Sequence, residues 1–301
     1  MAAFLPGARP NGAGRDPPSS IAARAVLARD VHLILAQEAA VFPLPDPLQP
    51  TTVLKWTTKC PHFSRIYSTL RPAHQHESRD QEEVLAGTLI CIVLHAHAWR
   101  RLALQGELAE ADLVGEDVLV DAAALASANP SSTATSVDIG IHIYHIENTH
   151  RDAWASAVCA GTSPPLRERA LQDLGAALRD LQHALRVPVQ LVGVSALAVS
   201  LQGIHLTANV WNMVEPPVRA DDYVVKYTDG SMALVALPTR HDFDAFLAKN
   251  RGQLAGTPLR TRMLYATPDM PSVLWQYLDP APRSGHDALL VSADGVGPIV
   301  G

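Results

Sequence analysis

The stretch Val137-Asp-Ile-Gly-Ile-His-Ile-Tyr-His-Ile146 alternates apolar and polar residues. Side chains of alternate residues point to the same face of an extended strand. One face would carry the apolar residues Val137, Ile139, Ile141 and Ile143. The other face would carry Asp138, Gly140, His142 and Tyr144. This pattern predicts a half-buried strand whose apolar face is turned to a hydrophobic core.

The flanking segments predict the partners of this strand. The segment 166–185 has leucine and alanine at helical spacing and predicts a long amphipathic helix. Further strands are expected near 89–99, 189–211 and 223–237. Covering helices are expected at 21–40, 149–160 and 166–185. We therefore expect an α+β fold, with a mainly antiparallel sheet covered on one side by helices.

Composition predicts one globular unit with loose ends. The chain has 301 residues, of which 48% are hydrophobic and 18% charged, and this balance is not that of a disordered protein. We expect a flexible tail over 1–18, a single α+β domain over 19–290 and a frayed tail over 291–301. A candidate internal boundary lies near 131–136, where the sequence is rich in serine and threonine.

Charge and cysteine content narrow the class of protein. The formal net charge of -6 indicates no nucleic-acid partner, because such domains usually carry a basic surface. Three scattered cysteines argue against a disulfide framework and favour the cytoplasm or another reducing intracellular compartment. No apolar run is long enough to predict a membrane span.

The 13 histidines include a pair, His95-Ala-His97, at the end of the strand expected over 89–99. Alternate residues of a strand share a face, so both imidazoles are expected to reach one metal ion. Metal-dependent hydrolases and non-haem oxygenases use such pairs, with zinc or iron as the metal. His142 or His205 is the expected third ligand.

A second histidine cluster combines Cys60-Pro-His62 with His74-Gln-His76. Thiolate and imidazole are the ligands that zinc prefers, and four of them complete a tetrahedral site. The sequence therefore offers Cys60, His62, His74 and His76 as a second candidate zinc site. The alternative is a polar loop that contains histidines.

His142 and His145 are expected on opposite faces of the strand over 137–146, because their positions differ by three, an odd number. His145 would then be a core histidine with its hydrogen bonds satisfied. His142 and Tyr144 would share the polar face, either lining a pocket or facing solvent.

Motifs for nucleophile elbows, phosphate loops and dinucleotide binding do not occur in the sequence. Two functional hypotheses follow. The first is a non-enzymatic interaction or assembly protein that binds protein partners or forms a homo-oligomer, with an exposed tryptophan marking the interface. The second is a metal-dependent enzyme, a hydrolase or a non-haem oxygenase, that uses the His95/His97 pair.

Overall fold

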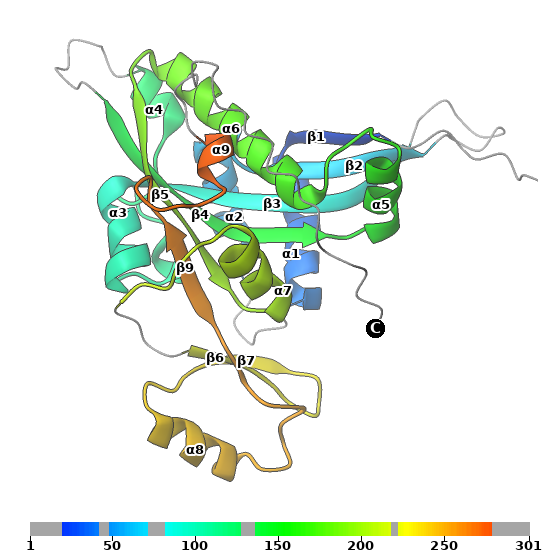
Figure 1. The fold of residues 1–301 in the computed structure, drawn as a ribbon, viewed down its shortest axis with the longest axis vertical. Coiled ribbons are helices and arrows are strands. Elements are labelled where there is room, and N and C mark those ends of the chain that lie inside the picture. The colour runs from blue at the N-terminus through cyan, green and yellow to red at the C-terminus, as the bar shows by residue number, and fades with distance from the viewer. Residues whose placement is uncertain (1–19, 42–47, 72–81, 128–135, 218–221, 279–301) are drawn as a thin grey trace, which may run out of the picture.

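A computed structural model describes residues 20–41, 48–71, 82–127, 136–217 and 222–278. The largest element is a six-stranded sheet in the order β1-β2-β3-β4-β5-β9 (Figure 1). Its strands are β1 (Ile21–Ala25), β2 (Arg65–Arg71), β3 (Glu82–His95), β4 (Val137–Asn148), β5 (Val189–Ala198) and β9 (Arg262–Ala266). Neighbours in this sheet are antiparallel except β4 and β5, which run parallel.

The parallel pair results from the connection between β4 and β5. Two helices, α5 (Arg151–Cys159) and α6 (Leu166–Leu185), return the chain to the end of the sheet at which β4 begins. A parallel pair needs such a crossover, because a tight turn can only reverse the chain direction. The predicted strand over 137–146 and the predicted helices over 149–160 and 166–185 are confirmed.

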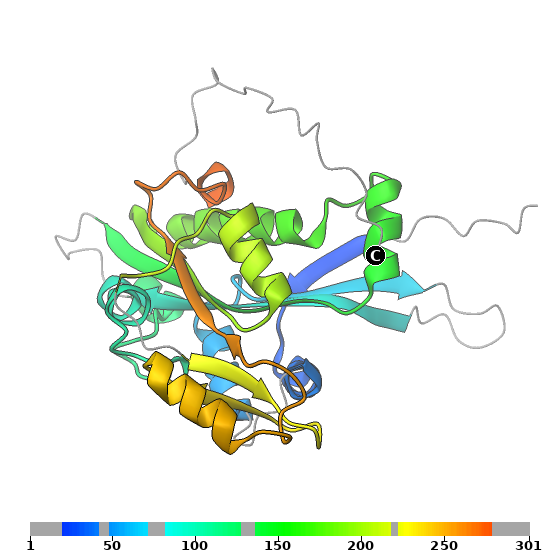
Figure 2. The same cartoon turned by 60° about the horizontal axis from the view of Figure 1, so that its bottom comes forward.

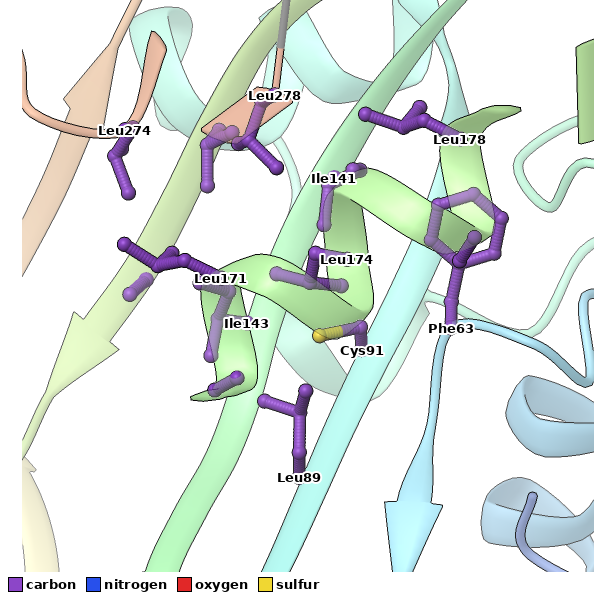
Figure 3. Close-up of a cluster of buried hydrophobic side chains, with 14 of the residues drawn as sticks. Phe63, Leu89, Cys91, Ile141, Ile143, Leu171, Leu174, Leu178, Leu274 and Leu278 are labelled. Atoms are coloured by element: carbon purple, nitrogen blue, oxygen red, sulfur yellow. The ribbon is translucent and has the colours of Figure 1, made fainter. Parts of the chain in front are cut away.

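The α6 stripe packs on one face of the sheet. Figure 3 shows Leu171, Leu174 and Leu178 of this helix against the side chains of β3 and β4. The β3 and β4 side chains in this first cluster are Leu89, Cys91, Ile141 and Ile143. Helix α9 (Trp275–Leu278) adds Leu278 to the same cluster. The apolar stripe is therefore a core face of the protein.

Helices also cover the opposite face of the sheet, where α1 (Val31–Val41), α2 (Pro50–Lys59) and α3 (Ala96–Arg100) pack (Figure 2). The α+β class is confirmed. Helices cover both sides of the sheet, however, and not the one side that we expected. The reason is the continuous apolar run of β3, whose residues alternate between the two clusters: Leu89 and Cys91 in the first, Ile90 and Ile92 in the second. A strand that is apolar on both sides needs a partner layer on each.

The helix predicted over 21–40 is wrong at its beginning. Residues Ile21–Ala25 form β1, which pairs with β2, and η1 (Ala28–Asp30) precedes α1. Arg24 donates to the buried Asp30, which also accepts from the Leu27 backbone N–H and so fixes the turn between strand and helix. Pairing with a strand some 45 residues away overrides the local helical spacing, as tertiary context often does.

Two predicted strands end earlier than expected. β3 ends at His95, and α3 followed by η2 (Arg101–Gln105) takes the next residues. β5 ends at Ala198, and Ser200 then caps α7 (Leu201–Ile204), which continues into η4 (His205–Val210). The short segments η3 (Glu110–Asp112) and α4 (Ala122–Ser127) lie between α3 and β4.

A second, three-stranded sheet has the order β7-β6-β8 and lies beside the start of β9 (Figure 1). Its strands are β6 (Asp222–Lys226), β7 (Met232–Ala236) and β8 (Leu259–Arg260), and α8 (Arg240–Lys249) packs on it. The predicted hairpin is confirmed, with Gly230 at φ 88° in the turn. We call this unit the appended sheet. The predicted tails and most of the predicted boundary at 131–136 lie outside the described residues.

None of the described helices combines the length and the apolar composition needed to cross a membrane.

Candidate functional site

A β-bulge in β4 creates the candidate site. Cys91 of β3 pairs with Ile143, but the preceding residue, Ile90, pairs with His145, so Tyr144 is an extra residue in β4. Residues paired across strands share a face, and Ile90 belongs to the second cluster. The bulge therefore turns His145 toward the α1–α2 side. Without the bulge, His145 would face Leu89 and the first cluster.

Glu38 of α1 lies over this bulge and contacts both side chains. The Tyr144 hydroxyl donates a hydrogen bond of 2.9 Å to Oε1 of Glu38, and Nδ1 of His145 lies 3.3 Å from Oε2. The Tyr144 ring also packs on Trp56 of α2, with ring centroids 4.8 Å apart. Burial raises the pKa of Tyr144, and the charges of Glu38 and Glu110 raise it further, so the phenol stays protonated.

His145 is held in a form that suits proton acceptance. Its side chain is only 10% exposed, and its Nε2 is buried with no hydrogen-bond partner in the described parts of the chain. A carboxylate beside Nδ1 favours the tautomer with the proton on Nδ1. In that tautomer Nε2 presents a lone pair.

The cavity beside His145 lies where β4 and β5 part. Their last paired residues are Ile143 and Ala196, and the strand arrows diverge beyond that point in Figure 1. A cavity of about 440 Å³ is lined by the ends of both strands, by α7 and η4, and by three residues of the appended sheet. Tyr144 and His145 are among the lining residues. A cavity of this size, mostly apolar with a few polar groups, is typical of a small-molecule site.

A second polar chain crosses the same side of the sheet. Nδ1 of His142 lies 3.0 Å from the Ser195 hydroxyl on β5, and Nε2 lies 2.7 Å from Oε1 of Glu110. His142 and Ser195 are fully buried, whereas the Glu110 side chain is 22% exposed. The order Ser–His–Glu resembles that of a hydrolase triad in residue types, but neither Ser195 nor His142 is among the residues that line the cavity. This chain therefore anchors Glu110 near Tyr144.

Two glycines bring Trp99 of α3 into contact with the sheet. A Cβ at Gly140 would lie 2.1 Å from the Trp99 ring, and one at Gly193 would lie 2.2 Å from it. The indole therefore takes the place of two side chains on β4 and β5. This contact fixes the start of the segment that carries Glu110 across the sheet face.

The structure does not assemble the first predicted metal site. His95 ends β3, but His97 lies in α3, so the expected alternation on one strand is wrong because helix begins at Ala96. Their rings stack at 5.9 Å instead. In the expected third ligands, Nδ1 of His142 contacts Ser195 and Nε2 contacts Glu110. The exposed His205 is hydrogen-bonded to Asn209.

The second predicted metal site lies partly outside the described residues, because His74 and His76 do. His62 is exposed, and Cys60 is buried with its thiol donating to the Val120 carbonyl. Burial raises the pKa of the Cys60 thiol to about 12, which disfavours the thiolate that zinc binds. Among the described residues no three His, Cys, Asp or Glu side chains form a group suited to a metal ion. Metal binding by either set stays a prediction.

The structure corrects the interpretation of His142 and His145. They do not lie on opposite faces, because the bulge at Tyr144 intervenes, and His145 is not a histidine with both nitrogens satisfied. Sequence reasoning left the face of Tyr144 open between a pocket and solvent, and it missed Glu38, Glu110 and Ser195. No local motif marks these three residues.

The comparisons with known proteins give no family. No protein-family model matches the sequence, and no curated protein is similar to it. One solved structure with a similar course of the chain is the crystal structure of Arabidopsis thaliana NAA60 in complex with a bisubstrate analogue. It is 9% identical, with a TM-score of 0.36 over 82% of this chain and 99% of that chain.

Proposed function

We propose that the protein is an enzyme that transfers an acyl group, with His145 as the general base. The observation that carries the proposal is the unpartnered, buried Nε2 of His145, on a ring whose other nitrogen faces Glu38, at the wall of a cavity. A buried imidazole nitrogen without a partner is costly in a folded protein, and a catalytic role is one of the reasons for which such a cost is retained.

The reaction follows from these positions. An acceptor hydroxyl, amine or water gives its proton to Nε2 of His145 as it attacks the carbonyl carbon of the donor. The new bond forms at that carbon, and the tetrahedral intermediate expels the leaving group. The leaving group takes the proton back from the imidazolium. Glu38 stabilises the imidazolium between the two steps.

The separation of β4 from β5 beside the cavity supports acyl transfer in particular. Past Ile143 and Ala196, the two strands no longer pair with each other, so each turns backbone edge groups toward the cavity. Backbone N–H groups stabilise the oxyanion that forms only when a carbonyl is attacked, and they act strongly where water is excluded. The apolar walls supply that exclusion.

Direct transfer fits the site better than a covalent intermediate. The hydroxyl-bearing residues of the cavity wall are Ser200, Thr207 and Tyr144. Ser200 caps α7 by accepting from the Gly203 N–H, and Thr207 donates to the Gly203 carbonyl. Tyr144 donates to Glu38. Thr207 and Tyr144 thus donate their protons within the fold, and Ser200 serves as a helix cap, so we infer that the acceptor itself supplies the nucleophile.

The tryptophans that could mark an interface, and the apolar stripe of α6, are part of the packing inside the fold. Trp56, Trp99, Trp154 and Trp211 are buried, and Trp275 is half-buried. The long apolar stripe of α6 is part of the core. Neither feature leaves a surface that would mark a partner.

Chromogenic esters test the proposal. We expect the protein to cleave p-nitrophenyl butyrate with transfer to water or to an added primary amine. His145→Asn should lower kcat/KM by about 100-fold or more, the scale of general-base catalysis. His183→Asn is the matched control, because His183 is exposed on α6. A wild-type rate equal to that of His145→Asn would refute the proposal.

A further inference from the structure

We propose that the appended sheet measures the length of an aliphatic chain on the acyl donor, with Met232 as the residue against which the chain ends. This inference rests on the proposed function and names its substrate class: donors with an unbranched hydrocarbon tail rather than acetyl-sized groups. The tail would extend from the His145 end of the cavity to the wall that the appended sheet provides.

The pairing of the appended sheet turns one apolar face to the cavity. Val224 pairs with Leu259, and Lys226, two residues further along β6, pairs with Met232. Paired residues and alternate residues share a face, so Val224, Leu259 and Met232 all lie on the same side. All three line the cavity.

The opposite face of the appended sheet is occupied by α8. Tyr223 packs on Phe243 of this helix with ring centroids 4.8 Å apart, and Val225 is fully buried. The sheet thus has apolar side chains on both faces, and the face away from α8 carries Val224, Leu259 and Met232 together with the exposed Lys226. The cavity takes the place of a second covering layer.

The chemistry of this wall suits hydrocarbon. Valine, leucine and methionine offer no hydrogen bond, so a polar tail would lose its water without compensation. Methionine is unbranched and polarisable, so its side chain packs closely against the end of a hydrocarbon tail. The polar lining residues lie elsewhere, on β4 (Tyr144, His145 and Glu147) and along Ser200, α7 and η4 (Ser200, Gln202 and Thr207). A ligand with one reactive end and one apolar end matches this distribution.

The size of the effect follows from burial. Each methylene transferred from water into the cavity should raise kcat/KM about fourfold, from about 0.8 kcal/mol per buried CH₂. The rise should stop when the tail reaches Met232. Longer tails should then lose kcat/KM, because the wall resists overpacking.

The experiment measures kcat/KM for p-nitrophenyl esters from acetate to dodecanoate. We expect Met232→Ala to move the optimum to a longer chain by two or three carbons, and Met232→Trp to move it to a shorter chain. Leu234→Ala is the matched control, because Leu234 pairs with Val224 on the same face but is 45% exposed and does not line the cavity. An optimum that stays the same in both Met232 variants, or that shifts equally in Leu234→Ala, would overturn the inference.

A binding measurement separates this inference from the proposed function. N-phenyl-1-naphthylamine, a neutral apolar fluorophore, is bound to the His145→Asn protein and displaced by primary alcohols from butanol to dodecanol. A length preference that shifts in Met232→Ala supports the inference even if no ester is cleaved, in which case only the proposed catalysis fails. Ester cleavage that depends on His145, together with displacement independent of alcohol length, retains the catalysis and overturns the length-measuring role.

Discussion

Replacing Ser195 by alanine should destabilise the protein by about 1–3 kcal/mol, because it leaves a nitrogen of a buried imidazole without its partner. His142 and Ser195 are both 0% exposed, and the Nδ1–Oγ distance is 3.0 Å. Alanine removes one oxygen atom, and the space left is too small for a water molecule to replace it. His142 cannot turn away either, since its Nε2 stays 2.7 Å from Glu110.

Urea unfolding followed by tryptophan fluorescence measures this loss. The slope of free energy against urea should not change, since the surface exposed on unfolding is the same. Glu110→Gln should cost less than Ser195→Ala, because the amide oxygen still accepts from His142. Ser156→Ala on the exposed face of α5 is the control and should stay within about 0.5 kcal/mol of wild type. A Ser195→Ala protein as stable as that control would refute the assignment of a buried polar chain.

Three further outcomes are expected. Gly140→Ala should cost about 3 kcal/mol or more and lower the urea midpoint, because its Cβ would lie 2.1 Å from the Trp99 ring; an unchanged midpoint would contradict this contact. Burial disfavours the Asp30 carboxylate, but the hydrogen bonds from Arg24 and a backbone N–H outweigh burial and lower the pKa of Asp30. The carboxylate therefore stabilises the fold above about pH 4, and this stabilisation is lost as the pH falls further. Asp30→Asn should thus be less stable than wild type at pH 7, with the gap narrowing on acidification, and a gap independent of pH would speak against the ion pair. If the predicted set of His95 and His97 binds zinc, zinc should raise the melting temperature and the rise should disappear in His95→Ala; a melting temperature that zinc leaves unchanged would contradict that prediction.

Local patterns predicted the elements whose residues are determined by their own spacing. The α6 stripe, the alternation of β4 and the Asp-Gly turn of the β6–β7 hairpin each depend on neighbours within a few residues. β1 could not be predicted from local spacing, because its five residues suit either a helix or a strand. Only the presence of β2 at the sheet edge decides between them.

The candidate site is formed by residues that are far apart in the sequence. Tyr144 and Glu38 are 106 residues apart, and His142 and Ser195 are 53 apart. No spacing rule connects such pairs, because their meeting depends on which helix covers which strand. Sequence analysis could place Tyr144 and His142 on one strand face, but it could not supply the carboxylates that hold them.

The bulge in β4 shows why the one decisive histidine was interpreted wrongly. If the alternation of β4 were unbroken, the His145 side chain would lie in the first cluster under α6, with Leu89 as its cross-strand neighbour. One extra residue at Tyr144 reverses that assignment and exchanges an apolar neighbour for Glu38. The regular part of β4 ends where its pairing with β5 ends, so the irregular backbone lies at the mouth of the cavity. Bulges redirect side chains in this way beside active sites, and their cost in strand pairing is retained where the redirected side chain is needed. The position of the bulge is thus a reason, independent of the unpartnered nitrogen, to assign function to His145.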